Sequence, residues 1–229
     1  MQKATLRKIR QGVVAVLLIA MVALTATARA RKLYPVDEGP KDASFKAFRD
    51  KLIEAVKQHN TRFLLSVLHP KVRLSFGGHS GVRDFREMWK PDSHDTEVWE
   101  KLSTVLSLGG TFSTAEGKKL FWAPYTFSTF PEDLDAFEYA AIVGDNVRVR
   151  SKPNATASIV TNLSYDIVKT FPGGDSAREG DIRGWVRVVV QDGRNGYVAS
   201  KYIRSPIDYR LGFEKIRGKW LIIAFVAGD

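Results

Sequence analysis

The periodicity of apolar residues changes near Tyr139, and this change constrains the fold more than any other feature. Before that position, apolar residues recur at three- and four-residue spacing, as in amphipathic helices. After it, short β-type runs are separated by Gly, Asn and Asp, which are common turn residues. We therefore expect an α+β chain with a helix-rich N-terminal part and an all-β part from about residue 140.

Four helical stretches are expected before residue 110. The first is capped by Asp42 or Ser44, and the second begins at Asn60 and stops before Pro70, because the residue before proline avoids helical backbone. The stretches cover residues 42–56, 60–68, 82–89 and 95–106. Strands are expected at residues 72–76, around Phe112 and over residues 121–127.

The last segment of the chain predicts a β-hairpin over residues 209–226, with its turn at Arg217-Gly218. Its second strand is a continuous apolar run that includes Trp220, Ile222 and Phe225. These side chains are too apolar to stay exposed. We expect the hairpin to pack on the N-terminal part of the chain.

Residues 1–30 have the features of a secretory signal. Its basic start consists of Lys3, Arg7, Lys8 and Arg10. The apolar run 13–24 and the small-x-small pattern Ala28-Arg29-Ala30 follow. The run is 12 residues long, whereas a bilayer core needs roughly 20. We expect cleavage after Ala30 and a periplasmic or secreted protein; the alternative is an inner-membrane anchor through residues 12–28.

Charge and cysteine content exclude several classes of protein. The net charge of +10 falls to +5 without the signal, because 30 basic minus 25 acidic residues remain. Charges of both signs are interspersed, with no run of five or six basic residues, so nucleic acid is not an expected partner. The chain has no cysteine, which excludes disulfides, thiol chemistry and lipoprotein acylation.

Four segments between residues 140 and 206 resemble the bacterial Src-homology-3 domain in order and approximate spacing. They are 146–153 (NVRVRSKP), 158–163 (SIVTNL), 184–188 (GWVRV) and 196–203 (GYVASKYI). The residues themselves agree with a strand, since Val147 and Val149 alternate with Arg148 and Arg150. The resemblance implies a small β-barrel, in which the long segment 171–183 enlarges a loop.

This resemblance implies a non-catalytic role, in which the barrel binds cell-wall peptide or glycan, or an envelope protein. The candidate binding residues are Arg148, Arg150, Lys152, Trp185, Tyr197 and Tyr202. A second interpretation stays open for each. The aromatic residues can fill the core of a small barrel, and the basic residues can form a solvated face.

The flanking segments 42–130 and 209–226 are similar to the cone-shaped fold of nuclear-transport-factor-2-like proteins. The similarity lies in two helices, a strand, the Gly-Gly-His-Ser-Gly turn at residues 77–81, a helix ending in Trp, and the terminal hairpin. It implies that the barrel is inserted into a single α+β domain. Such pockets serve acid–base enzymes as well as ligand-binding proteins, so the fold alone does not choose between them.

No complete catalytic or metal-binding set occurs in the sequence. The four histidines lack the i,i+4 pairing of a helical metal site, and neither His-Glu-x-x-His nor Gly-x-Ser-x-Gly is present. We expect no metal and no cofactor. The alternative is a small periplasmic hydrolase or isomerase whose pocket uses His79, Asp84 and Tyr125, although these also fit a turn residue, a helix-start charge and a strand aromatic.

The sequence thus predicts an exported, non-catalytic envelope binding or scaffold protein that contacts cell-wall polymer or an envelope protein. The expected parts are a signal peptide (1–30), a mobile lead (31–41), an α+β domain (42–136 with 207–229) and a Src-homology-3-type barrel (140–206).

The signal hypothesis predicts the N-terminus of the protein in the cell. Mass spectrometry of protein recovered from the envelope is expected to give an N-terminus near Arg31, because the cleavage pattern ends at Ala30. Recovery of an intact Met1 form from the membrane fraction contradicts this prediction.

Overall fold

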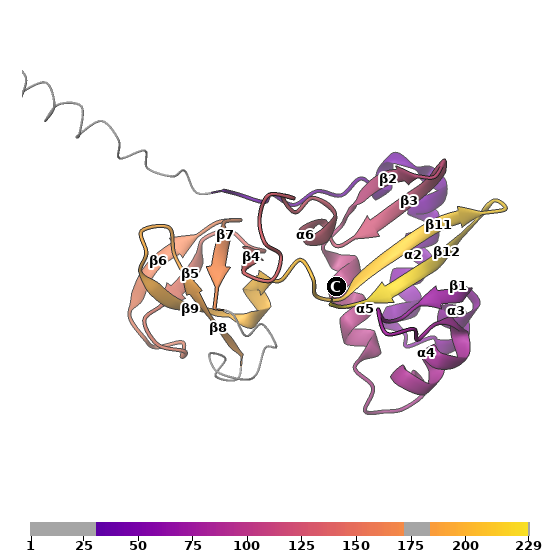
Figure 1. Cartoon of the computed structure of the whole chain (residues 1–229). Coiled ribbons are helices and arrows are strands. Elements are labelled where there is room, and N and C mark those ends of the chain that lie inside the picture. The colour runs from indigo at the N-terminus through magenta and orange to yellow at the C-terminus, as the bar shows by residue number, and fades with distance from the viewer. Residues whose placement is uncertain (1–30, 172–183, 229) are drawn as a thin grey trace, which may run out of the picture. The chain divides into compact units, whose positions relative to one another are not determined.

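The computed structural model describes residues 31–171 and 184–228 of the chain (Figure 1). These residues form a mixed α+β structure with two β-sheets, of five and seven strands. The predicted α+β class is confirmed. The signal segment and residues 172–183 of the expected long loop lie outside the described residues, and the division into domains stays a prediction.

Helix α2 (Ala43–Lys57) shows why the N-terminal part of the chain is helical. The Asp42 side chain caps it by accepting hydrogen bonds from the backbone N–H groups of Ser44 (2.9 Å) and Phe45 (3.0 Å). The apolar stripe is buried, as the periodicity predicts. The other helices of the described residues are α3 (Thr61–Ser66), α4 (Gly81–Trp89), α5 (Val98–Ser107) and α6 (Tyr125–Ser128), with 3-10 turns η1 (Gly39–Lys41) and η2 (Ser200–Tyr202).

The five-stranded sheet has the order β1-β12-β11-β3-β2. Its strands are β1 (Leu68–Arg73), β2 (Thr111–Ala115), β3 (Lys118–Ala123), β11 (Arg210–Ile216) and β12 (Lys219–Val226). The predicted terminal hairpin is confirmed, because β11 and β12 pair antiparallel. It also lies inside the sheet, where β12 pairs parallel with β1 and β11 pairs antiparallel with β3.

Aromatic rings fix α2 to this sheet. The Phe45 ring centroid lies 4.3 Å from that of Phe121 on β3, 5.4 Å from that of Phe213 on β11 and 4.9 Å from that of Trp220 on β12. Phe45, Phe121 and Phe213 are fully buried. The hydrophobic core therefore joins the first helix to both strands of the terminal hairpin.

Two strand boundaries differ from those predicted. The strand expected over residues 121–127 ends at Ala123, because Pro124 lacks an N–H for the ladder, and helix α6 follows. Strand β1 begins at Leu68, before Pro70, whereas the sequence predicts a start at Val72. Proline is tolerated there because β1 is the outermost strand of its sheet.

The seven-stranded sheet has the order β10-β4-β7-β8-β9-β5-β6. Its strands are β4 (Tyr139–Ile142), β5 (Val147–Arg150), β6 (Ile159–Leu163), β7 (Ile167–Thr170), β8 (Trp185–Val189), β9 (Asn195–Ala199) and β10 (Ile203–Arg204). Its core contains Val147, Val149, Val188 and Val198. The expected closed barrel is not found among the described residues. The end strand β10 has two residues, and these pair with β4, so no ladder with β6 closes the sheet.

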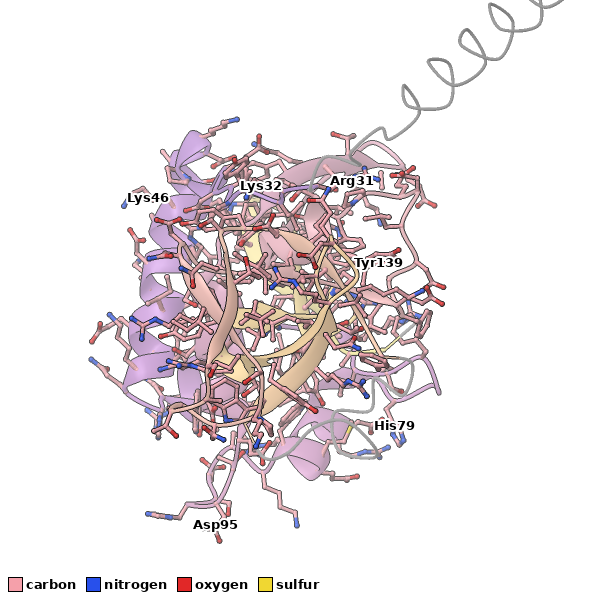
Figure 2. All side chains as sticks on the ribbon, turned by 90° about the vertical axis from the view of Figure 1, so that its left-hand side faces the viewer. Arg31, Lys32, Lys46, His79, Asp95 and Tyr139 are labelled. Atoms are coloured by element: carbon pink, nitrogen blue, oxygen red, sulfur yellow. The ribbon has the colours of Figure 1, made fainter. Side chains whose placement is uncertain are left out.

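The segment 31–41, expected to be a mobile lead, makes specific contacts with the rest of the described chain. Leu33 is buried, and the Lys32 ammonium (Figure 2) lies 3.1 Å from a carboxylate oxygen of the buried Asp166. Asp37 accepts a 2.8 Å hydrogen bond from the Arg49 guanidinium on α2. The contacts of Lys32 and Asp37 join this Pro- and Gly-bearing segment to residues distant in the sequence, and its mobility stays a prediction.

The cap of α2 predicts how stability depends on pH. The Lys119 ammonium, the Ser44 hydroxyl and the Phe45 N–H hold the pKa of Asp42 well below its usual range. The ionised carboxylate therefore stabilises the fold above about pH 4, the unfolded value, and this contribution is lost as the pH falls toward the folded pKa. As the pH is lowered below about 4, the unfolding free energy of Asp42→Asn is expected to fall less steeply than that of wild type. Chemical denaturation at a series of pH values measures this difference.

Asp42→Ala also removes the cap and is expected to lower the unfolding free energy by about 1 kcal/mol at neutral pH. The control is Asp50→Asn, which removes an exposed carboxylate paired with Lys46 one helical turn away. If the unfolding free energies of Asp42→Asn and Asp50→Asn fall equally steeply with decreasing pH, the Asp42 carboxylate is not the source of this pH dependence.

Candidate functional site

Two arginines flank a tyrosine on adjacent strands of the seven-stranded sheet. Tyr197 on β9 is directly opposite Arg187 on β8 and directly opposite Arg150 on β5. Directly opposite residues of antiparallel strands have their side chains on the same face. These three residues, named here the Arg–Tyr–Arg row, therefore run across β8, β9 and β5 (Figure 1).

The row lies on the face opposite the core. Each member is next to a fully buried valine in its strand. The neighbouring valines are Val149 before Arg150, Val188 after Arg187 and Val198 after Tyr197. Side chains alternate between faces along a strand, so the row is directed away from that core. Its three residues are partly buried, which means that they present accessible atoms on a packed surface.

The two guanidinium groups of the row are held differently. The Arg187 guanidinium stacks 3.9 Å from the ring centroid of Phe171. Arg150 donates a 2.7 Å hydrogen bond from Nη1 to the carbonyl of Ala157. In the described part of the chain, neither arginine forms an ion pair with a carboxylate. Both therefore retain hydrogen-bond donors for an anionic ligand.

A second row lies beside the first on the same face. Trp185, two residues before Arg187 on β8, pairs with the small residue Ala199 on β9. Arg148, two residues before Arg150 on β5, is exposed and pairs with Asn162 on β6. The two rows together therefore place the partly buried rings of Trp185 and Tyr197 and the guanidinium groups of three arginines on one face of three neighbouring strands.

The structure brings some of the predicted binding residues together and separates others. Arg150 and Tyr197 are direct neighbours, whereas Lys152 lies exposed in the turn after β5. Tyr202 belongs to η2, where its exposed ring lies near Gly144 and the Lys201 ammonium. Sequence reasoning missed Arg187, although the same alternation that marks Arg148 and Arg150 is visible in Trp185-Val-Arg187-Val.

The residues of the catalytic alternative do not converge. His79 Nδ1 lies 3.8 Å from Asp84 Oδ2, but the His79 side chain is 62 % exposed at the surface (Figure 2). Tyr125 is buried in a separate hydrophobic cluster with Leu33 and Ala141. Burial, and to a lesser degree the nearby Tyr165, raises the pKa of Tyr125 to about 12. A tyrosine with this pKa stays protonated at neutral pH.

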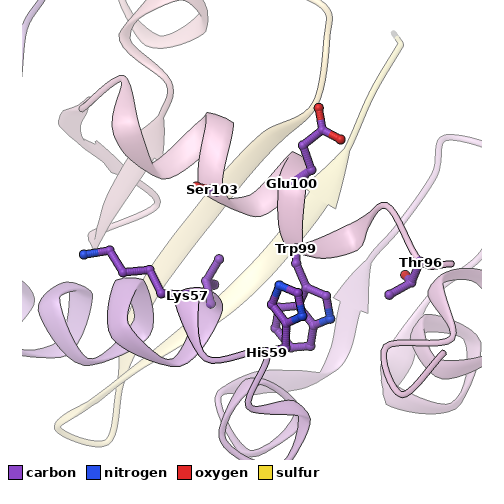
Figure 3. A pocket seen from close by; sticks show the side chains of 7 residues that line it. Lys57, His59, Thr96, Trp99, Glu100 and Ser103 are labelled. Carbon is purple, nitrogen blue, oxygen red and sulfur yellow. The ribbon is translucent and has the colours of Figure 1, made fainter. Parts of the chain in front are cut away.

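A shallow cavity of about 280 Å³ lies between α2 and α5 and was not predicted from the sequence. The His59 imidazole stacks on the Trp99 indole with ring centroids 5.1 Å apart and planes 6° apart (Figure 3). The Trp99 indole N–H donates to the carbonyl of Pro91 at 3.2 Å, which fixes the ring. Lys57 and Glu100 also line this cavity. It is a small depression with a mixed polar and apolar lining, in which His59 stacks on the Trp99 ring.

The described ranges hold no group of three or more His, Asp or Glu side chains placed to bind a metal ion. Within residues 31–171 and 184–228, no helix is long and apolar enough to span a bilayer. No protein-family model matches the sequence, and neither a curated protein nor a solved structure matches the chain.

The burial of Tyr125 predicts how two substitutions at this position change the unfolding free energy. Its hydroxyl is buried and has no hydrogen-bond partner among the described residues. Removing an unsatisfied buried hydroxyl does not cost a hydrogen bond, so Tyr125→Phe is expected to keep or raise the unfolding free energy, by up to about 1 kcal/mol. Tyr125→Ala, which also removes the ring, is expected to lose about 3–5 kcal/mol. Thermal or denaturant unfolding measures both, and a marked loss in Tyr125→Phe contradicts the prediction.

Proposed function

We propose that this chain is a non-catalytic binding protein of the bacterial envelope, and that the outer face of β8, β9 and β5 is its binding surface. The observation that carries the proposal is the Arg–Tyr–Arg row, in which Tyr197 lies between Arg187 and Arg150. Guanidinium groups recognise carboxylate or phosphate with paired hydrogen bonds, and an aromatic ring offers an apolar surface between them. This combination is suited to binding, because the row contains no histidine or carboxylate that could serve as a general base.

We further propose that residues 140–206 are a binding module of the bacterial Src-homology-3 type. The four segments that carry the resemblance fall on or next to β5, β6, β8 and β9, and the buried valines alternate with exposed residues as a small β module requires. The five-stranded sheet and its helices, with the terminal hairpin inside, agree with a cone-like domain that receives this module as an insertion.

The proposed location in the envelope rests on the sequence of residues 1–30. A basic start, a short apolar run and a small-x-small pattern favour export. Cell-wall polymers and many envelope surfaces carry anionic groups, which a face with several guanidinium groups attracts. We therefore propose cell-wall polymer as the main partner of this face.

Retention on isolated cell wall tests the proposal. Purified residues 31–229 are expected to sediment with the wall and to be released by salt, because screening weakens charge-mediated contacts. Arg150→Ala/Lys152→Ala is expected to reduce retention, and adding Arg187→Ala is expected to reduce it further. Deletion of residues 140–206 is expected to abolish it.

The matched control removes two positive charges elsewhere. Arg62 and Arg83 are exposed residues of α3 and α4, so Arg62→Ala/Arg83→Ala changes the net charge equally and leaves the seven-stranded sheet intact. Retention that is absent in the native protein, or unchanged after deletion of residues 140–206, rules out this face as the binding surface. An equal loss in the control assigns retention to net charge alone.

A further inference from the structure

Two tyrosines that are distant in the sequence meet at the surface of the described chain. The ring centroids of Tyr34 and Tyr165 lie 5.6 Å apart, with the ring planes tilted by 50°. This separation is a contact distance for aromatic side chains. Tyr34 is 60 % exposed and Tyr165 is partly exposed, so both residues are accessible to small reagents in solution. Among the described residues, no other two tyrosine rings are in contact.

Backbone pairing places the two tyrosines beside each other. The backbone N–H of Leu33 donates a 2.7 Å hydrogen bond to the carbonyl of Tyr165. Lys32 and Asp166 form an antiparallel bridge, and the Lys32 ammonium lies 3.1 Å from the Asp166 carboxylate. Tyr34 directly follows these paired residues. The ring contact is therefore a consequence of the pairing between two chain segments, and not a chance approach of two long side chains.

The backbone of Tyr165 adopts an unusual conformation at this point. Its φ angle is 58°, in the left-handed region that residues with a bulky side chain rarely occupy. Such a conformation persists only where the surrounding contacts impose it. Here the Tyr165 N–H donates to the carbonyl of Gly144 at 3.1 Å, and the Tyr165 carbonyl accepts from Leu33. Hydrogen bonds on both sides of the residue thus fix the conformation that places its ring against Tyr34.

We propose that Tyr34 and Tyr165 form an oxidative cross-linking site. A carbon–carbon bond between the two phenol rings would fasten residues 31–34 to the turn between β6 and β7. The chain has no cysteine, so a disulfide cannot supply such a link. The inference does not depend on the proposed function, because it involves neither the Arg–Tyr–Arg row nor a cell-wall ligand.

The oxidant of this reaction is hydrogen peroxide, used by a haem peroxidase. Each phenol loses one electron and one proton and becomes a phenoxyl radical. The two radicals couple through carbons ortho to the oxygen atoms, and the hydrogen on each of these carbons moves to the oxygen, which restores both aromatic rings and both hydroxyls. Two C–H bonds are lost and one C–C bond is formed, while the two electrons and two protons reduce one peroxide to two water molecules.

The exposure of Tyr34 allows the two rings to reach the bonding geometry. Rotamer changes of exposed side chains take picoseconds to nanoseconds, so the Tyr34 ring samples orientations beside Tyr165 without any movement of the paired backbone. Holding two reactants next to each other favours their coupling over reactions with more distant partners. The link within one molecule is therefore expected to form before links between molecules.

Oxidation of purified residues 31–229, which form one compact unit, tests the proposal. After treatment with peroxide and a haem peroxidase at low protein concentration, the monomer is expected to show dityrosine fluorescence. Trypsin, which cuts after Lys and Arg but not before Pro, releases Tyr34 in peptide 33–41 and Tyr165 in peptide 151–169, each with a single tyrosine. Mass spectrometry is expected to find these two peptides joined, with a mass lower than their sum by two hydrogen atoms.

Substitutions identify the partners of the link. Tyr34→Phe and Tyr165→Phe keep a ring but remove the phenol, so each is expected to abolish the joined peptides. The matched control is Tyr139→Phe on β4, which removes a partly exposed tyrosine that contacts no other tyrosine ring among the described residues and is expected to leave the yield unchanged. Absence of the joined peptides in wild type, dityrosine only in covalent dimers, or an equal loss in the control overturns the proposal.

Two further measurements separate the native contact from random coupling. Oxidation in concentrated urea is expected to lose the joined peptides, because unfolding separates the two tyrosines; an undiminished yield overturns the role of the fold. Oxidised wild type is expected to unfold at a temperature several degrees above that of the untreated protein, because a link between residues distant in the sequence restricts the unfolded chain. Tyr34→Phe treated in the same way is expected to show no such rise. An unchanged unfolding temperature in cross-linked wild type overturns the fastening role.

Discussion

The backbone pairing of the terminal hairpin with β1 and β3 holds the N-terminal part of the molecule together. Strands β12 and β11 lie between β1 on one side and the β2–β3 pair on the other, so within the described sheet these strands are connected through the terminal hairpin. Buried backbone N–H and C=O groups must be paired, and here the last strands of the chain provide the partners. The aromatic contacts of Phe45 with Phe213 and Trp220 extend the same dependence to helix α2.

This arrangement places a geometric condition on the residues between β3 and β11. They must leave the five-stranded sheet and return to it, and the seven-stranded sheet meets that condition because its first and last strands are neighbours. Ile142 of β4 pairs with Ile203 of β10, so the segment begins and ends at one edge. The ion pair of Lys32 with the buried Asp166 joins the start of the described chain to the same sheet.

The proposed binding surface follows from strand register. Arg187 and Tyr197 lie on the consecutive strands β8 and β9, Arg150 lies on the distant strand β5, and their order across the sheet is Arg187, Tyr197, Arg150. A shift of one residue in any pairing would direct one of these side chains into the valine core. The buried residues Val149, Val188 and Val198 therefore fix the positions of the exposed ones. The packing of the core determines the geometry of the surface.

The sequence by itself determined the α+β class, a capped start of α2 at Asp42 or Ser44, the terminal hairpin and the β-rich texture after Tyr139, because periodicity, capping and turn chemistry are local properties. It also pointed to Arg150 and Tyr197 as candidates, but not to Arg187 as their companion. The pairing of Lys32 with Asp166 and the stacking of His59 on Trp99 were likewise decided by tertiary structure. The physical reason is that the sequence encodes which residues alternate along one strand, whereas only the packing of strands from distant parts of the chain decides which residues meet across them.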